Sequence, residues 1–276
     1  MTTLACMQRE ADTRVNNRKK TNRMPRFNVA LYVTCLVDLF RPSVAFDSIA
    51  LLERAGCKVS VPKQQSCCGQ PSYNTGDYES TIPLAQQVIE AFEFADYVVV
   101  PSGSCAGMIT QHYPKLLEGA WRERALTLAA KTFELTTFLA EIAEMQAPIE
   151  DGVRLPSVTY HDSCAGLREL GIRAQPRDLL KKLRNTQVRE LSQTEVCCGF
   201  GGTFCAKMPE LSGKMTSDKL DSALATEAKI LAGGDMGCLM NIAGRAKRLG
   251  KTIEVRHVAE LLAGNLSKPA IGEGKS

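Results

Sequence analysis

Four cysteines recur in the same order after about 130 residues, and this repeat constrains the fold more than any other feature of the sequence. Each set contains two adjacent cysteines followed by glycine, in 66-SCCGQ-70 and 196-VCCGF-200. The offsets between matched cysteines are 129, 130, 130 and 133 residues, which indicates an internal duplication. The two sets are Cys35, Cys67, Cys68 and Cys105, and Cys164, Cys197, Cys198 and Cys238.

The segments around these cysteines alternate between strand and helix patterns. Apolar strand-like runs end at the first cysteine of each set, and further apolar runs pass through a glycine turn into the last one. The predicted strands are 28–35, 57–61, 97–100, 157–164, 187–191, 228–231 and 252–255, and the predicted helices are 44–56, 81–95, 176–183, 209–225, 237–249 and 257–264. Such alternation favours parallel sheets covered on both faces. We predict an α/β fold of two pseudo-symmetric parallel-sheet halves.

The domain boundaries follow from composition. The first repeat is predicted over 25–147 and the second over 156–266, joined by a stretch rich in proline, glycine and charge near 146–156. Residues 267–276 are predicted to be a disordered C-terminal tail. Residues 1–24 are predicted to be a disordered basic tail or an upstream extension, with Met24 opening the structured protein.

The net charge of +4 comes entirely from residues 1–24, which carry six basic and two acidic side chains. The remaining chain has 28 of each and gives no electrostatic case for binding nucleic acid. The basic head lacks the apolar core of a signal peptide, and no apolar run is long enough to span a membrane. We therefore expect a cytoplasmic protein with no membrane span.

Eleven cysteines are many for such a chain, and without a secretion signal they indicate metal or redox chemistry rather than a disulfide framework. Adjacent cysteines are also poor disulfide partners. In parallel α/β folds ligands bind beyond the carboxyl ends of the strands, so we expect the four thiols of each half to converge there.

Four thiolates per half suit either an iron–sulfur cluster or tetrahedral zinc. Structural zinc favours two cysteines with two to four residues between them, and neither set contains such a pair. Two adjacent sulfurs suit a larger cluster, where each can bind a different iron. Gly69 and Gly199 would let the backbone pass close to inorganic sulfide and donate amide hydrogen bonds to it.

The doubled pattern resembles the cysteine-rich CCG domain, which occurs in the heterodisulfide reductase B subunit and in the iron–sulfur subunit of glycolate oxidase. The resemblance is closest to the lactate-utilisation protein A group of iron–sulfur oxidoreductases. It covers about residues 27–265 and includes 159-TYHDSC-164 and 235-DMGCLMNI-242. The resemblance implies an electron-transfer subunit that holds [4Fe–4S] clusters on the eight cysteines. It would serve the oxidation of L-lactate to pyruvate together with a ferredoxin-type iron–sulfur subunit and a third lactate-utilisation subunit. Glycolate or another 2-hydroxy acid is equally consistent with the residues.

The sequence departs from the family's motif at one position in each half. The full motif ends in Cys-x-x-Cys, and relatives use all five cysteines for a fused noncubane cluster arrangement. Here Ser102 and Asp235 stand where the motif has its additional cysteine. Four thiols still satisfy one [4Fe–4S] cluster, whereas zinc in one half and an oxygen ligand from Asp235 stay open.

Several other residues have competing interpretations. His161 and Asp162 precede Cys164 and could tune a cluster by hydrogen bonding, or cap the strand end. Cys205 could be a spare ligand or a packing residue. The remaining candidates are assigned structural or incidental roles: a tail thiol, a buried apolar thiol, two helix-position histidines and a solvated basic helix face, namely Cys6, Cys57, His112, His257 and 177–184.

Three function classes remain open. The chain has no P-loop, no dinucleotide-binding fingerprint and no ferredoxin-type cysteine run, so a cluster-bearing chain of this kind would pass electrons to partner subunits. The second class is an interaction subunit whose fold is stabilised by zinc and which has no redox activity. A thiol–disulfide enzyme that cycles Cys197 and Cys198 is the third, but it leaves the first set of cysteines without a role. No catalytic residue is predicted.

Overall fold

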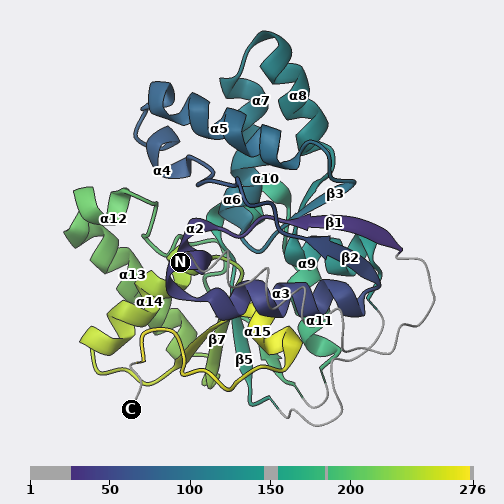
Figure 1. The fold of residues 1–276 in the computed structure, drawn as a ribbon. Coiled ribbons are helices and arrows are strands. Elements are labelled where there is room, and N and C mark those ends of the chain that lie inside the picture. The colour runs from purple at the N-terminus through teal and green to yellow at the C-terminus, as the bar shows by residue number, and fades with distance from the viewer. Residues whose placement is uncertain (1–25, 146–154, 184–185, 274–276) are drawn as a thin grey trace.

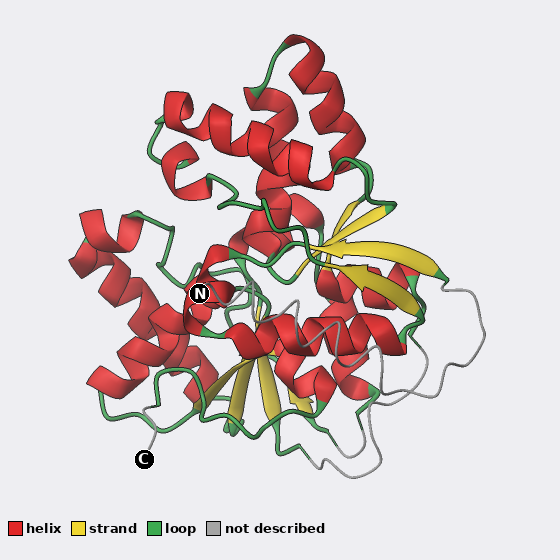
Figure 2. Cartoon of the chain, in the orientation of Figure 1, coloured by secondary structure: helices red, strands yellow, loops and turns green. Residues whose placement is uncertain are grey.

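The computed structural model describes residues 26–145, 155–183 and 186–273 (Figure 1). Each half contains a four-stranded sheet in which every strand pairs in parallel, as Figure 2 shows in yellow. The strand orders are β2-β1-β3-β4 and β6-β5-β7-β8, so the two sheets share one topology. The predicted pair of parallel-sheet halves is confirmed.

The strands are short and their bounds agree closely with the predicted ones. The first sheet contains β1 (Phe27–Leu31), β2 (Cys57–Ser60), β3 (Tyr97–Val100) and β4 (Thr132–Glu134), and the second contains β5 (Val158–His161), β6 (Val188–Arg189), β7 (Ile230–Gly233) and β8 (Glu254–His257). The central strands β3 and β7 are almost wholly buried, as expected of parallel strands covered on both faces. β4 was not predicted, because three residues are too few to show a periodic pattern.

Helices connect the strands and cover both sheets. In the first half they are α2 (Cys35–Phe40), α3 (Pro42–Arg54), α4 (Gln70–Tyr73), α5 (Tyr78–Phe92), α6 (Gly103–Gly107), the π-helix η1 (Met108–His112), α7 (Tyr113–Leu116), α8 (Gly119–Ala129), α9 (Leu135–Thr137) and the π-helix η2 (Phe138–Ile142). In the second half they are α10 (Cys164–Leu170), α11 (Ala174–Lys181), α12 (Phe204–Lys207), α13 (Pro209–Leu224), α14 (Met236–Arg248) and α15 (Val258–Ala263). None of the helices in the described part of the chain has the length and apolarity needed to cross a membrane.

The two halves pack against each other through equivalent helices. Helix α3 of the first half packs against α15 of the second, and the equivalent helix α11 packs against α9 and η2. One hydrophobic core includes residues from both sheets. Helices α6 and α10 approach so closely that a Cβ atom on Gly103 would lie 2.9 Å from the Cα atom of Gly166. The repeats therefore form one body.

The predicted termini and joint are described only in part. Residues 1–24 and most of the predicted joint lie outside the described residues. At the C-terminal end, Ala270 is buried and the Ile271 amide donates a 2.9 Å hydrogen bond to the Val255 carbonyl. Ala270 and Ile271 of the predicted C-terminal tail therefore lie against the second half.

Candidate metal centres

The strands deliver the matched cysteines to equivalent places. Cys35 and Cys164 are the first residues of α2 and α10, which follow β1 and β5. Cys105 and Cys238 lie in the first turn of α6 and α14, which follow β3 and β7. The adjacent cysteines of each set occupy the loop after β2 or β6. All these segments leave the carboxyl ends of parallel strands, where ligands bind in folds of this kind.

In the first half the sulfur atoms lie in two close pairs. The Sγ atoms of Cys35 and Cys67 are 3.8 Å apart, and those of Cys68 and Cys105 are 3.4 Å apart. The Tyr113 hydroxyl donates a 2.8 Å hydrogen bond to the Cys68 carbonyl and fixes the loop. None of the described cysteines forms a disulfide.

In the second half the loop of Cys197 and Cys198 is held by side chains of α13 and α14. The Cys198 carbonyl accepts hydrogen bonds from Thr216 at 2.8 Å and Asn241 at 3.1 Å. The Gly199 amide donates to the Cys197 sulfur at 3.3 Å, which is the kind of hydrogen bond that stabilises a thiolate.

Gly69 and Gly199 share one backbone conformation, with φ of +79° in both. Side chains strain this left-handed region, so glycine is the favoured residue. A Cβ atom on Gly199 would also lie 2.7 Å from the Ser212 carbonyl oxygen of α13. Both requirements, a turn with positive φ and close approach to a helix, explain why glycine follows each cysteine pair.

All eight candidate cysteines line a single cavity of about 400 Å³ between the two halves. The halves therefore place their thiols opposite one another instead of building separate sites on distant surfaces. The cavity is also lined by polar and aromatic residues that the sequence analysis did not single out, including Gln70, Asn74, Glu169, Phe200 and Thr203.

The electrostatics of the thiols fit a bound cation. Hydrogen bonds from neighbouring thiols lower the pKa of Cys67 and Cys197, while the same contacts and burial raise the pKa of Cys35 and Cys164. Hydrogen bonds to neighbouring thiols, and burial, also raise the pKa of Cys68 and Cys198. Packed thiols of this kind cannot all ionise unless positive charge compensates them, and a metal ion or iron–sulfur core supplies that charge. The donor set fits such a group.

The two residues that replace the motif's additional cysteines bond to each other. One carboxylate oxygen of Asp235 accepts hydrogen bonds from the Ser102 hydroxyl at 2.7 Å and the Ser104 hydroxyl at 2.6 Å. The other accepts from the Ser104 amide at 3.0 Å. Both residues line the cavity, and Asp235 is buried. Asp235 therefore links the second half to the first, and its oxygens already have donors from the protein.

Asp162 faces a buried arginine. Its two carboxylate oxygens each accept a 2.8 Å hydrogen bond from Arg177, whose Nε atom also donates to Glu190 at 2.8 Å. Arg177 is buried, so the prediction that 177–184 forms a solvated helix face is wrong for this residue. Lys181 on the same helix is exposed as predicted.

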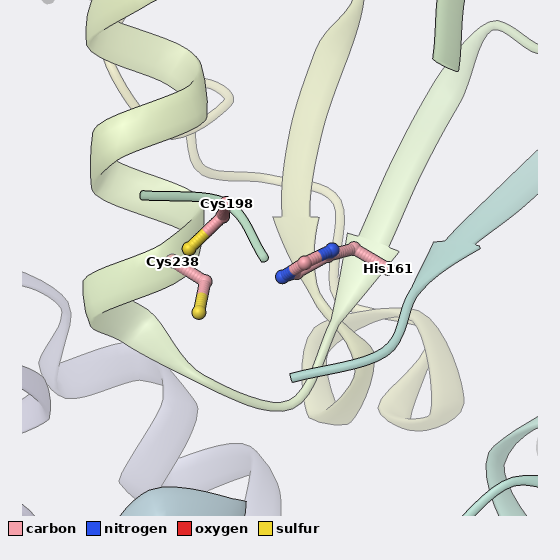
Figure 3. A group of neighbouring side chains, drawn as sticks. All are labelled: His161, Cys198 and Cys238. Atoms are coloured by element: carbon pink, nitrogen blue, oxygen red, sulfur yellow. The ribbon is translucent and has the colours of Figure 1, made fainter. Parts of the chain in front are cut away.

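His161 lies at the end of β5 with its imidazole ring directed toward Cys198 and Cys238 (Figure 3). The ring is 1% exposed, and neither of its nitrogens has a hydrogen-bond partner among the described residues. One nitrogen of His161 and the sulfurs of Cys198 and Cys238 all lie within 4.8 Å of one another. His161 is therefore next to the second set of thiols.

The other cysteines and histidines have mostly structural surroundings. Cys57 is buried, and burial raises its pKa to about 11. The Cys205 thiol donates to the Gly202 carbonyl at 3.3 Å and does not line the cavity. His257 is buried and caps α15, whereas His112 lines the cavity and lies 3.1 Å from Glu169 of the other half.

Lys219 is a buried basic residue that the sequence pattern did not reveal. It lies on α13, and its ammonium group donates to the Gln193 carbonyl. Burial lowers the pKa of the Lys219 ammonium group, and the nearby Asp162 and Cys198 oppose this shift without reversing it. Helix α5 of the first half corresponds to α13, since these helices pack against Gly69 and Gly199 respectively. In this alignment Val88 of α5 takes the place of Lys219. Among the described residues, only the second set of thiols has a buried basic side chain nearby.

Glu134 is a buried carboxyl with an unusual pKa. Its Oε2 atom accepts hydrogen bonds from Thr136, while Oε1 has no partner among the described residues. Burial raises the pKa of Glu134 to about 7 in spite of those hydrogen bonds. The folded protein therefore favours the protonated form more than the unfolded chain does.

We expect this carboxyl to make the folded state less stable as pH rises. The stability that the protonated Glu134 contributes is fully present below the unfolded pKa of about 4.5 and is lost as pH rises through 7. The free energy of unfolding should fall by about 3 kcal/mol over this range. Glu134→Gln removes the ionisable group, so the unfolding free energy of the variant relative to the original chain should increase by that amount between pH 4 and pH 8. Urea unfolding of both proteins in one metal state measures this difference. For the control Glu79→Gln, at an exposed position, the difference in unfolding free energy from the original chain should not change with pH. A pH-independent difference for Glu134→Gln would contradict the expectation.

Comparisons with known proteins agree with this architecture. The cysteine-rich CCG domain matches residues 29–110 and 158–243. Lactate utilization protein A of Shouchella clausii is 47% identical over 239 residues, covering 85% of this chain and 98% of that protein. The protein of the same name from Halalkalibacterium halodurans is 46% identical over 236 residues, covering 85% of this chain and 96% of that protein.

Among solved structures, a hypothetical protein from Helicobacter pylori aligns with a TM-score of 0.59 at 10% identity. The alignment covers 96% of this chain and 54% of that one, so the chain spans about half of its length. This likeness shows the fold alone. The duplicated cysteine-rich CCG domain and the nearly full-length relatives show that the chain belongs to the lactate utilization protein A family.

Proposed function

We propose that this chain is the iron–sulfur electron-transfer subunit of an oxidoreductase that oxidises L-lactate to pyruvate. Each half would hold one [4Fe–4S] cluster on its four cysteines. The observation that carries the proposal is the single cavity between the halves, which is lined by all eight matched thiols. The relatives named lactate utilization protein A supply the choice of lactate.

The chemistry of the cavity favours electron transfer over substrate oxidation in this chain. Bound clusters would accept and release single electrons. A 2-hydroxy acid carries a carboxylate, which proteins usually bind with arginine or lysine. No arginine or lysine from the described residues lines the cavity, and the carboxylates of Glu169 and Asp235 do. Substrate oxidation would therefore take place on a partner.

The proposed partners are a ferredoxin-type iron–sulfur subunit and a third lactate-utilisation subunit. A chain that passes electrons through two clusters would need both a source and an acceptor of electrons. Cytoplasmic location remains part of this proposal.

Zinc in the first half is a second candidate, favoured by the sulfur spacing. In tetrahedral zinc with 2.3 Å bonds the sulfur atoms lie about 3.8 Å apart. The Cys35–Cys67 and Cys68–Cys105 distances of 3.8 Å and 3.4 Å are close to that value. In this case the first half would be a structural site and the second half a redox site.

Iron, acid-labile sulfide and zinc per chain, measured on anaerobically purified protein together with its visible spectrum, test the proposal. We expect about eight irons and eight sulfides, as two [4Fe–4S] clusters require. About four irons with one zinc would support the second candidate. A colourless zinc protein that cannot be reconstituted with iron and sulfide would overturn the electron-transfer function.

A further inference from the structure

The imidazole of His161 lacks the partners that a buried polar group needs. The residue is 1% exposed, and both ring nitrogens are without a hydrogen bond in the described part of the chain. Buried polar groups are nearly always paired, so an imidazole with two unpaired nitrogens indicates a ligand or ion that belongs beside it.

The direction of the ring identifies where that partner would lie. Three separate segments meet here, because His161 ends β5, Cys198 is in the loop after β6 and Cys238 is in α14 (Figure 3). One nitrogen and the two sulfurs lie within 4.8 Å of one another. An ion at the centre of a triangle with such sides would lie about 2.8 Å from each corner, against 2.0–2.3 Å for bound zinc. Small side-chain movements would therefore bring all three atoms onto one metal.

Both ring nitrogens of His161 are free to bind a metal. Neither takes part in a hydrogen bond in the described part of the chain. A neutral imidazole has one nitrogen with a free lone pair, which is the form that binds metals.

The first half has no equivalent donor among its described residues. Tyr32 occupies the position that corresponds to His161, three residues before the first cysteine of its set. The Tyr32 hydroxyl donates a 2.6 Å hydrogen bond to the Ser66 carbonyl and is therefore satisfied. The difference between the halves is thus a difference in donor set.

We propose that His161 is a protein ligand of the metal centre in the second half, in addition to the thiols of that half. The second half then has five donors, four sulfurs and one nitrogen, whereas the first half has four thiols. This inference rests on the proposed metal centres, but it holds for iron or zinc alike.

The two halves also differ in the charge near their thiols. The buried side chain of Lys219 lies near the second thiol set, and a cation there favours the more negative, reduced form of a redox centre. We expect the second centre to be reduced before the first, which gives electrons a preferred direction between the halves.

Pulsed electron paramagnetic resonance of the partly reduced protein tests the inference. The chain has three histidines, so labelling histidine with ¹⁵N reports on few sites. We expect strong nitrogen hyperfine coupling that changes with the label and disappears in His161→Tyr, the variant that copies the first half. His112→Gln is the matched control, because His112 lines the same cavity, and it should keep the coupling.

The possible outcomes test the role of His161 as a ligand separately from the proposed function. Coupling that is absent from the cluster-loaded original chain, or that is lost in His112→Gln and kept in His161→Tyr, overturns the inference. If the protein holds zinc alone, the electron-transfer proposal fails, and X-ray absorption at the zinc edge decides on His161. Nitrogen in the zinc coordination shell that is lost in His161→Tyr supports the inference, and an all-sulfur shell in the original chain overturns it. Because the spectra of the original chain can overturn the inference by themselves, poor folding of a variant does not leave it untested.

Discussion

Cys68→Ser is expected to empty the metal centre of the first half and leave the second loaded, and Cys198→Ser is expected to do the reverse. Both thiols are buried, and each is held by hydrogen bonds to its backbone carbonyl, from Tyr113 in the first half and from Thr216 and Asn241 in the second. A serine hydroxyl stays protonated at neutral pH and is a poor ligand for iron or zinc. We expect iron and sulfide per chain to fall by about half in each variant and to near zero in the double variant.

Cys205→Ser is the matched control. Cys205 lies in α12, seven residues after Cys198, and does not line the cavity, while its thiol donates to the Gly202 carbonyl, a hydrogen bond that serine can also make. The control should therefore keep the full metal content. Circular dichroism of each variant checks that metal loss is not caused by unfolding.

The pair of variants also distinguishes two centres from one. Because all eight thiols line one cavity, a single group shared between the halves would be an alternative arrangement. In that case either substitution alone would remove most of the iron. Equal and additive losses support one centre per half, whereas complete loss from a single substitution contradicts it.

The repeat allowed much of the fold to be predicted. Cysteines in register at offsets of 129 to 133 residues indicated two similar halves, and the periodic segments placed all the described strands but β4, and six of the described helices, within a few residues. The remaining short helices and α8 were not predicted. The strand order and the packing of one half on the other could not be predicted, because neither leaves a periodic signal. The hydrogen bond between Ser102 and Asp235 is an example. Both positions were recognised as departures from the motif, but sequence alone could not show that they meet.

Buried charges were the main features that the sequence did not reveal. Arg177 and Lys219 lie on helices with ordinary charged faces, where a basic side chain is usually exposed. Their burial depends on partners from other segments, Asp162 at the end of β5 and the carbonyl of Gln193. A single sequence contains no record of such pairs.

Arg177→Met is expected to cause a large loss of stability, because it removes the hydrogen-bonded partner of both carboxylate oxygens of the buried Asp162. The side chains of Arg177 and Asp162 are 8% and 1% exposed, and they share two hydrogen bonds of 2.8 Å. Removing one partner of such a pair costs about 3–5 kcal/mol in the free energy of unfolding. For a chain of this size, that corresponds to a thermal midpoint lower by roughly 10 °C.

The second acidic partner provides the control. Glu190 also bonds to Arg177, but its side chain is 53% exposed, so water replaces the interaction when it is lost. Glu190→Gln should therefore change the unfolding free energy by less than about 1 kcal/mol. Thermal unfolding of the metal-loaded proteins at one scan rate compares the variants.

The double variant Asp162→Asn with Arg177→Met separates the cost of an unpaired charge from the value of the pair. Buried ion pairs replaced as a whole often cost little, because both desolvation penalties are removed together. The double variant should thus recover a large part of the stability that Arg177→Met loses. Equal loss in the single and double variants would instead mean that the arginine acts through packing.

Because Asp162 lies two residues before Cys164, the single variant should also release metal from the second half at lower temperature than from the first. Simultaneous release from both halves would contradict this local role for the ion pair.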